Sequence, residues 1–215
     1  GDVYKRQVYR EVQNEFSKRL HTTEDVACMR ALNGIEVLSP SDENSAIAIT
    51  KAAINKPAFR YIRLERQPQN HLYHGNFTNS VEQGFVHLVE GVDVGIVGCG
   101  YLVHKALLAQ KSLKKSKVSA GVIDLFRIKT INAAGLTNIL SSYPALVTIE
   151  EQILDGGFGS AVLETLCDQK ISKPLKRLGI RDGFDVVNGN RDYLHDLYGI
   201  DTPHIVEAAL SIVGA

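Results

Sequence analysis

An arginine at the end of a predicted strand is the residue in this sequence best placed to bind a ligand. Arg66 closes the strand-like stretch AFRYIRLERQ, in which alternation puts it on the same face as Ile62 and Leu64. Because those two apolar side chains should face the core, Arg66 is expected on the core side, just past the strand. A guanidinium there, with Gln67 beside it, suits a phosphate. The alternative is an ordinary surface salt bridge.

A second group of candidates lies in ALVTIEEQILDGGFGSAVLETL, residues 145–166. A short apolar run predicts a strand that ends at two glutamates, and glycines then lead into a helix that Ser160 is expected to cap. Open α/β sheets place ligands and contacts at such loops. Acidic neighbours would repel a phosphate, so contact with another subunit is the favoured role. The predicted interface residues are Glu150, Glu151, Gly156, Gly157, Phe158 and Gly159.

Other sequence patterns are weaker evidence for a catalytic or binding site. Glu24 and Asp25 could act as acid or base, but at a predicted helix start they more simply satisfy the helix dipole. The stretch Gly98-Cys99-Gly100 imitates a dinucleotide fingerprint, yet Val103 stands where the third glycine should be. The sequence has no H-E-x-x-H, G-x-S-x-G or P-loop pattern. We therefore predict no metal site and no nicotinamide site.

Composition restricts the class of protein. The 215 residues are 44% hydrophobic and 22% charged with a formal net charge of zero, which is typical of a globular protein. No basic stretch is long enough to follow a nucleic-acid backbone, and no apolar run approaches the roughly 20 residues of a membrane span. The three cysteines are far apart and lack a C-x-x-C pair, so free thiols and a cytoplasmic location are predicted.

Strand and helix patterns alternate along the chain, which predicts an α/β fold with a mostly parallel sheet covered by helices. A polar stretch with Pro68 and Gly75 interrupts this alternation and is predicted to be a linker. The predicted strands are 35–38, 58–67, 92–97, 118–125, 147–149 and 175–180. The predicted helices start near residues 24, 42, 102, 132, 160, 192 and 202.

Four stretches together resemble the C-terminal half of transketolase-type, thiamine-diphosphate-dependent enzymes, over roughly residues 22–213. They are HTTEDVACMRALNGIEVLSPSD, AFRYIRLERQ, VIDLFRIKTINAAGL and VTIEEQILDGGFGSAVLE. The resemblance implies a partial α/β pyrimidine-binding domain over 22–70, a linker over 71–80 and a transketolase C-terminal domain over 81–215. Residues 1–21 are expected to be an atypical or non-native stretch.

The resemblance also implies ketol transfer with thiamine diphosphate and Mg²⁺. The family's pyrophosphate motif is absent here, as is its pyrimidine-binding glutamate, so this chain alone is expected to bind neither cofactor, to supply no catalytic residue and to be inactive. Arg66 matches the family arginine that binds the substrate's phosphate. Glu24-Asp25 matches a family E-D, but Leu20 stands where the family has a substrate-contacting histidine and His21 is one place off. Gln152 replaces another family histidine.

The sequence thus predicts the C-terminal section or subunit of a transketolase, acting on sugar phosphates as a homodimer or as a heteromer with an N-terminal section. Two members of the same superfamily are alternatives: 1-deoxyxylulose-5-phosphate synthase and the β subunit of a 2-oxoacid dehydrogenase. A noncatalytic dimerisation module is an alternative from another class.

Overall fold

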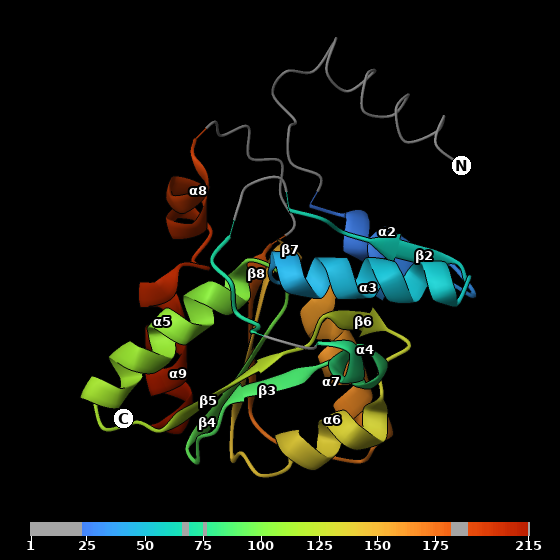
Figure 1. The fold of residues 1–215 in the computed structure, drawn as a ribbon. Coiled ribbons are helices and arrows are strands. Elements are labelled where there is room, and N and C mark those ends of the chain that lie inside the picture. The colour runs from blue at the N-terminus through green and yellow to red at the C-terminus, as the bar shows by residue number, and fades with distance from the viewer. Residues whose placement is uncertain (1–22, 66–68, 75–76, 182–188, 215) are drawn as a thin grey trace.

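The computed structural model describes residues 23–65, 69–74, 77–181 and 189–214 (Figure 1). Arg66 and the atypical stretch 1–21 lie outside these residues. Two sheets organise the described chain, one of five strands and one of three. None of the helices in the described ranges combines the length and apolarity needed to cross a bilayer.

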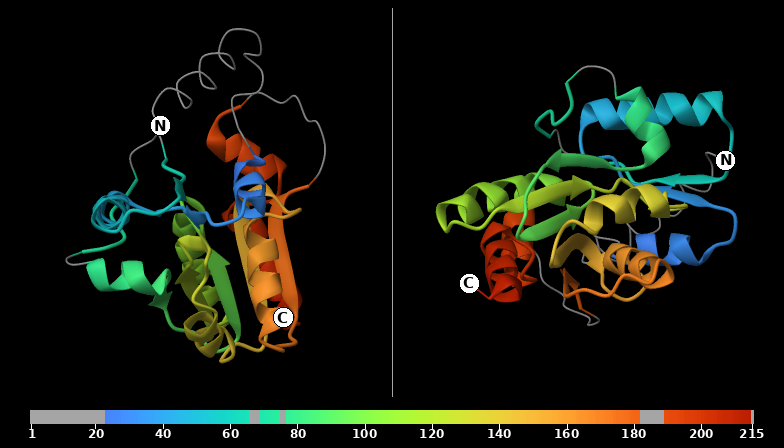
Figure 2. Two further views of the ribbon diagram at one scale, coloured as in Figure 1. Left: turned by 90° about the vertical axis from the view of Figure 1, so that its right-hand side faces the viewer. Right: turned by 90° about the horizontal axis from the view of Figure 1, so that it is seen from below.

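The larger sheet has the strand order β3-β5-β4-β7-β8, and every neighbouring pair is parallel except the edge pair β3 and β5. Its strands are β3 (Val86–Val89), β4 (Val94–Gly98), β5 (Ala120–Asp124), β7 (Leu146–Ile153) and β8 (Leu175–Ile180). Helices cover both faces (Figure 2). They are α5 (Leu102–Lys115) and α9 (Thr202–Val213) on one face, and α6 (Ala133–Leu140) and α7 (Phe158–Asp168) on the other.

Side-chain alternation along β4 shows how the sheet feeds two cores. Val94 and Ile96 pack with residues of α5 and α9, whereas Val97 packs with residues of α6 and α7. All three side chains are fully buried. A strand covered on both faces must be apolar at successive positions, and β4 reads VGIVG. The predicted α/β fold with a mostly parallel, helix-covered sheet is confirmed.

The smaller sheet joins the N-terminal part of the described chain, up to β2, to the part that contains the larger sheet. Its order is β2-β1-β6, with β1 (Glu36–Leu38) parallel to β2 (Arg60–Ile62) and antiparallel to β6 (Arg127–Lys129). Helices α2 (Asp25–Ala31) and α3 (Glu43–Asn55) belong to the same N-terminal part. Strand β6 follows β5 of the larger sheet after two residues. The C-terminal part of the chain therefore contributes one strand to the smaller sheet, whose other two strands come from the N-terminal part.

The segment predicted to be a linker is packed where it is described. Tyr73 is 8% exposed and its hydroxyl donates to Asp124 at 2.5 Å. The backbone N–H groups of Leu72 and Tyr73 donate to Oδ2 of Asp42, which also caps α3 in a capping box with Ser45. Helix α4 (Thr78–Gln83) then begins inside the predicted range. The domain boundary at 71–80 stays a prediction, but the chain there connects the two parts through buried polar contacts.

Candidate functional site at the carboxyl ends of the strands

Glu150 and Glu151 lie on opposite faces of the sheet. Strand β7 continues past both of them to Ile153, so the prediction that they end the strand is wrong. Successive strand residues face opposite ways, which sends Glu150 toward α7 and Glu151 toward α8 (Arg191–Leu197). The two carboxylates therefore bind two different helices.

Glu150 caps helix α7 from outside the helix. Its side chain is fully buried and its carboxylate accepts the backbone N–H groups of Phe158 at 2.6 Å and Gly159 at 2.8 Å. These are amides that a helix start leaves without an internal partner. The expectation that Ser160 caps the helix is wrong, because its hydroxyl donates to the carbonyl of Leu154 at 2.7 Å. Desolvation by burial raises the pKa of Glu150 to about 7, although those two N–H groups lower it.

The glycines of the turn leave room for this carboxylate. A Cβ added at Gly157 would overlap the carbonyl oxygen of Ile153 and Oε2 of Glu150. A Cβ at Gly159 would lie 2.7 Å from Oγ1 of Thr148 and 3.0 Å from Oε1 of Glu150. Only glycine at these positions lets a buried carboxylate approach the backbone so closely.

Helix α2 contacts the same turn. The guanidinium of Arg30 donates to the carbonyl of Gly156 and, at 2.8 Å, to that of Gly157. Of the six predicted interface residues, Glu150, Gly157, Phe158 and Gly159 are buried within the chain, Glu151 is partly buried and Gly156 is exposed. A subunit interface through these residues stays a prediction.

Glu151 is the centre of an ionic network on the other face. Its two oxygens accept Nε and Nη2 of Arg191, both at 2.6 Å, and Nε2 of His195 lies 2.7 Å from Oε1. Desolvation by burial would raise the pKa of Glu151, but the hydrogen bonds from His195 and Arg191 hold it down at about 2. Glu151 is therefore a permanently charged anchor for α8 at neutral pH.

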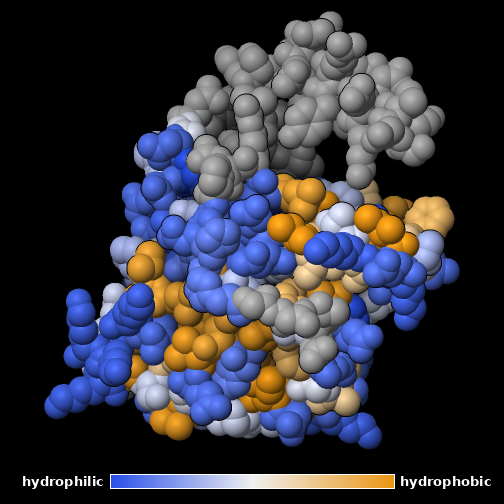
Figure 3. Space-filling model, viewed as in Figure 1, coloured by the Kyte–Doolittle hydropathy of each residue, from blue (hydrophilic) through white to orange (hydrophobic). Residues whose placement is uncertain are grey.

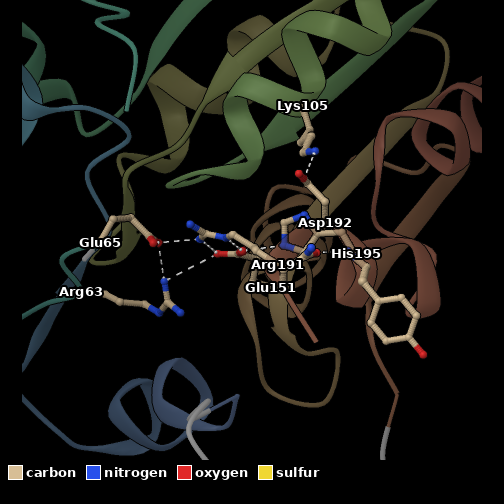
Figure 4. A network of polar contacts seen from close by, with 9 residues as sticks. Arg63, Glu65, Lys105, Glu151, Arg191, Asp192 and His195 are labelled. Atoms are coloured by element: carbon tan, nitrogen blue, oxygen red, sulfur yellow. Dashed lines mark hydrogen bonds and ion pairs between the residues drawn. The ribbon is translucent and has the colours of Figure 1, made fainter. Parts of the chain in front are cut away.

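A second carboxylate ties this network to the N-terminal part of the chain. Glu65 accepts Nη2 of Arg191 at 2.8 Å and Nη1 of Arg63 at 2.8 Å. Figure 4 shows Arg191 beside Glu151, with Arg63 and Glu65 on one side of this pair and His195 on the other. Nε of Arg63 also lies 3.3 Å from Oδ2 of Asp25 in α2. The network thus joins α2, the residues after β2, β7 and α8.

Asp124, at the end of β5, is a further buried acid at the same edge of the sheet. It pairs in register with Gly98 of β4 and is fully buried. Desolvation raises its pKa to about 7, even though the hydroxyl of Tyr73 stabilises the charged form. Asp124 is thus held largely as the neutral acid at slightly acidic pH.

The structure contradicts the strand alternation from which Arg66 was predicted to lie on the core side. Strand β2 ends at Ile62 and Leu64 is 61% exposed, so alternation does not carry Leu64 into the core. Arg63 and Glu65 turn into the ionic network instead. Sequence reasoning missed these two residues together with Arg191 and His195. The one local signal is the cation in the first turn of α8, which opposes the helix dipole.

Among the described residues, one group could offer three metal ligands, namely Asp196, Asp201 and His204. Asp201 is already used as the N-cap of α9, because its Oδ1 accepts the backbone N–H of His204 at 3.1 Å and lies 2.6 Å from Nδ1 of the same residue. A groove of about 590 Å³ lies elsewhere, between α5 and α9. Its lining contains none of the residues of the ionic network.

Comparison with known proteins gives one family. The family model described as "Transketolase, C-terminal domain" matches residues 84–205. The chain is 28% identical to a subunit of apulose-4-phosphate transketolase from Phocaeicola vulgatus over 193 residues, covering 90% of the chain and 61% of the relative. It is 29% identical over 196 residues to 1-deoxy-D-xylulose-5-phosphate synthase of Caldanaerobacter subterraneus subsp. tengcongensis, covering 86% of the chain and 30% of the relative.

A solved structure agrees with these sequence relatives. A split-gene transketolase, described as an inactive beta4 tetramer, superposes with a TM-score of 0.82 and 32% identity, covering 90% of the chain and 63% of that structure. A transketolase from Pichia stipitis shares the fold, with a TM-score of 0.72 at 24% identity over 92% of the chain and 28% of that structure. The chain spans about three to six tenths of the length of these proteins.

Proposed function

Because the chain belongs to the transketolase C-terminal domain family, we propose that it is the C-terminal section of a transketolase that moves a two-carbon ketol unit between sugar phosphates. The observation that carries this proposal is the alignment of nine tenths of the chain with a single subunit of apulose-4-phosphate transketolase. The split-gene structure of similar fold supports a division of labour between two polypeptides.

We propose that thiamine diphosphate and Mg²⁺ are held by the other section. The glycine-rich turn before α7 does not fit a pyrophosphate, because the N–H groups of Phe158 and Gly159 are taken by the Glu150 carboxylate. A second anion there would meet that carboxylate at close range. Thiamine diphosphate supplies the electron sink for breaking a carbon–carbon bond. This chain contributes structure, contacts with substrate and a surface for its partner.

The proposed substrate contact is Arg66, as an anchor for the sugar's phosphate. It follows directly on Glu65, whose carboxylate is fixed by two arginines. A guanidinium can bind two phosphate oxygens at once, which suits it to this role.

The proposed partner is an N-terminal transketolase section. The part of the chain around α3 and β2 keeps large hydrophobic side chains in solvent, and hydrophobic residues gather over these elements in Figure 3. Ile54 is 73% exposed, Phe59 81% and Leu64 61%. Burying such side chains against a partner would be favourable by roughly 25 cal/mol per Å² of apolar area. A homodimer is the second proposed contact, through Glu150, Glu151, Gly156, Gly157, Phe158 and Gly159. The proposed location is the cytoplasm, where Cys28, Cys99 and Cys167 stay free thiols.

Isothermal titration calorimetry tests this proposal. Thiamine diphosphate with Mg²⁺ is titrated into the chain alone and then into the chain mixed with an N-terminal transketolase section. We expect no heat in the first titration and a saturable signal with ketol transfer in the second. Tight binding by the chain alone would contradict the proposal. The absence of a heat signal in both titrations would favour a noncatalytic module.

A second candidate function is 1-deoxy-D-xylulose-5-phosphate synthesis, favoured by the alignment with that synthase over 196 residues. The same assembled protein separates the two candidates. Formation of 1-deoxy-D-xylulose 5-phosphate without ketol transfer would select the synthase.

A further inference from the structure

Strand β2 has one paired edge and one open edge. Within the described chain its single neighbour is β1, which separates it from β6. The carbonyl of Phe59 accepts the N–H of Glu36 at 2.9 Å, and the N–H of Arg63 donates to the carbonyl of Leu38 at 2.8 Å. Odd-numbered residues of this segment therefore direct their backbone groups toward β1, and the residues between them direct theirs away from it.

The outward backbone groups belong to Arg60 and Ile62. Their N–H and C=O groups make no hydrogen bond to any residue of the described ranges. Charged side chains often protect such an edge, but the Arg60 side chain is only 13% exposed. Its guanidinium is turned back onto Glu36 of β1 and the carbonyl of Lys56 after α3. The edge therefore offers two donors and two acceptors without a charge to block them.

Hydrophobic side chains lie beside this open edge. Phe59, directly before β2, is 81% exposed, and Ile54 in the last turn of α3 is 73% exposed. The two faces of the strand are occupied, because Ile62 packs on the core below α3 and Tyr61 packs on the core that contains Val26 of α2. A partner can therefore reach β2 along its edge and cover the two exposed side chains at the same time.

The described sheet already accepts a distant strand at its other side. Strand β6 comes from the C-terminal part of the chain and pairs with β1. A second copy of this chain fits the open edge less well, since two three-residue strands would meet over roughly 10 Å. That contact is small beside the roughly 1,600 Å² that a stable interface buries. A partner that brings further strands or helices with it would bury more.

We propose that the N-terminal section attaches by adding an extended strand to the outer edge of β2. The added backbone exchanges hydrogen bonds with Arg60 and Ile62, and its apolar side chains cover Phe59 and Ile54. This inference rests on the proposed function, which requires an N-terminal section, and adds the way in which that section is recognised.

Amide hydrogen exchange tests the strand addition on the unmodified protein. The amides of Arg60 and Ile62 should exchange rapidly in the chain alone and at least about tenfold more slowly after assembly with the N-terminal section used for calorimetry. The amide of Arg63 is the internal control, because it is bonded to Leu38 in both states. Unchanged exchange at Arg60 and Ile62 in the assembled protein would overturn the inference. Slow exchange of both in the chain alone would also overturn it, since the edge would then be taken by this chain or by a second copy.

A matched pair of variants tests the outward N–H group. Ile62→Pro removes it, whereas Ile62→Ala also loses the isoleucine side chain but keeps the N–H. We expect the Kd for the N-terminal section to be at least about tenfold higher for Ile62→Pro than for Ile62→Ala. Slow exchange at Arg63 in both variants alone checks that β2 still pairs with β1. Equal affinities of two variants that pass this check would contradict the strand addition.

A side-chain variant tests the flank without altering the backbone. Phe59→Ala should raise the Kd about tenfold, because a large apolar side chain no longer becomes buried. Val92→Ala is the control, since Val92 is 69% exposed but lies before β4, and it should leave the Kd unchanged. Equal Kd values for the two variants would overturn the inference.

Failure of this inference can be told from failure of the proposed function. An assembled protein that transfers ketol units, yet leaves the amides of Arg60 and Ile62 unprotected, would reject the strand addition alone. A chain that neither binds an N-terminal section nor supports ketol transfer with it would reject both.

Discussion

Glu150 and Glu151 share a peptide bond but hold two different helices on opposite faces of the sheet. The Glu150 carboxylate receives the first amides of α7, and the Glu151 carboxylate receives Arg191 and His195 of α8. The pKa of Glu150 is raised to about 7 and that of Glu151 is lowered to about 2. The difference follows from the partners, which are neutral amides in one case and positively charged or hydrogen-bonding side chains in the other.

Glu150→Ala should destabilise the chain strongly. The change leaves the N–H groups of Phe158 and Gly159 without their acceptor and opens a cavity in a fully buried site. We expect the free energy of unfolding to fall by about 2 to 4 kcal/mol in urea denaturation. Glu164→Ala, which removes a 61% exposed carboxylate on the same helix, should change it by less than about 1 kcal/mol. Equal effects of the two substitutions would refute the capping role.

Asp124→Asn should remove a pH dependence of stability. The pKa of Asp124 is raised from 3.8 to about 7, so between these values the folded state binds a proton that the unfolded state has lost. The free energy of unfolding contributed by this group therefore falls as pH rises from about 4 to about 7. Asparagine does not titrate. Relative to the unmodified chain, Asp124→Asn should become progressively more stable from about pH 5 to about pH 7 in denaturant unfolding. A constant difference across that range would contradict the raised pKa.

Glu151→Gln should show the opposite pH dependence. The folded pKa of Glu151 is about 2 against an ordinary 4.5, so its stabilising contribution is present above pH 4.5 and is lost as pH falls toward 2. The substitution should therefore be destabilising at about pH 6 and approach neutral near pH 2. Thermal unfolding at several pH values measures this difference. A penalty that stays the same at low pH would show that the network does not depend on the Glu151 charge.

Gly157→Ala should be more damaging than a substitution at an unobstructed glycine. The new Cβ would overlap the carbonyl oxygen of Ile153 and the Glu150 carboxylate, neither of which can move without disturbing the turn. We expect a loss of about 2 kcal/mol or more. Gly34→Ala is the control, because its Cβ meets nothing within 4 Å and only its φ of +73° is unfavourable, at about 1 kcal/mol. A smaller loss for Gly157→Ala than for Gly34→Ala would be incompatible with this turn.

Arg66→Ala in the assembled enzyme should raise KM for phosphorylated sugars. Hydrogen bonds to a charged group are typically worth about 1.5 to 3 kcal/mol, which corresponds to a rise of about ten- to a hundredfold. Steady-state kinetics with D-xylulose 5-phosphate measures it. An unaltered KM would eliminate the proposed anchor.

The parts of the fold with strong local signals could be predicted from sequence. Strand β8 occupies the predicted range Leu175–Ile180, and α9 begins at the predicted Thr202, with Pro203 in its first turn. Asn132 caps α6 as predicted, since its side chain accepts the N–H of Gly135 at 3.1 Å. In each case the apolar spacing or the capping residue lies within the element or directly before it.

The missed features depend on contacts between distant residues. Strand β6 is three residues long and is defined only by its pairing with β1. The network around Glu151 brings together Glu65 and Arg191, which are 126 residues apart in sequence. No local sequence pattern indicates that these two residues are close in space. Alternation also failed at Leu64, because β2 had already ended and the backbone no longer followed the strand period.

The strand shared between the two parts limits how the chain can be shortened. A version beginning at residue 84, where the family match starts, would retain β6 but lose β1, its neighbour in the smaller sheet. Such a truncation would bare backbone donors and acceptors along β6 and uncover Phe126, which packs in a core with Leu38 and Ile49. Unpaired strand edges beside exposed aromatic residues recruit other molecules, so the family domain expressed by itself would aggregate.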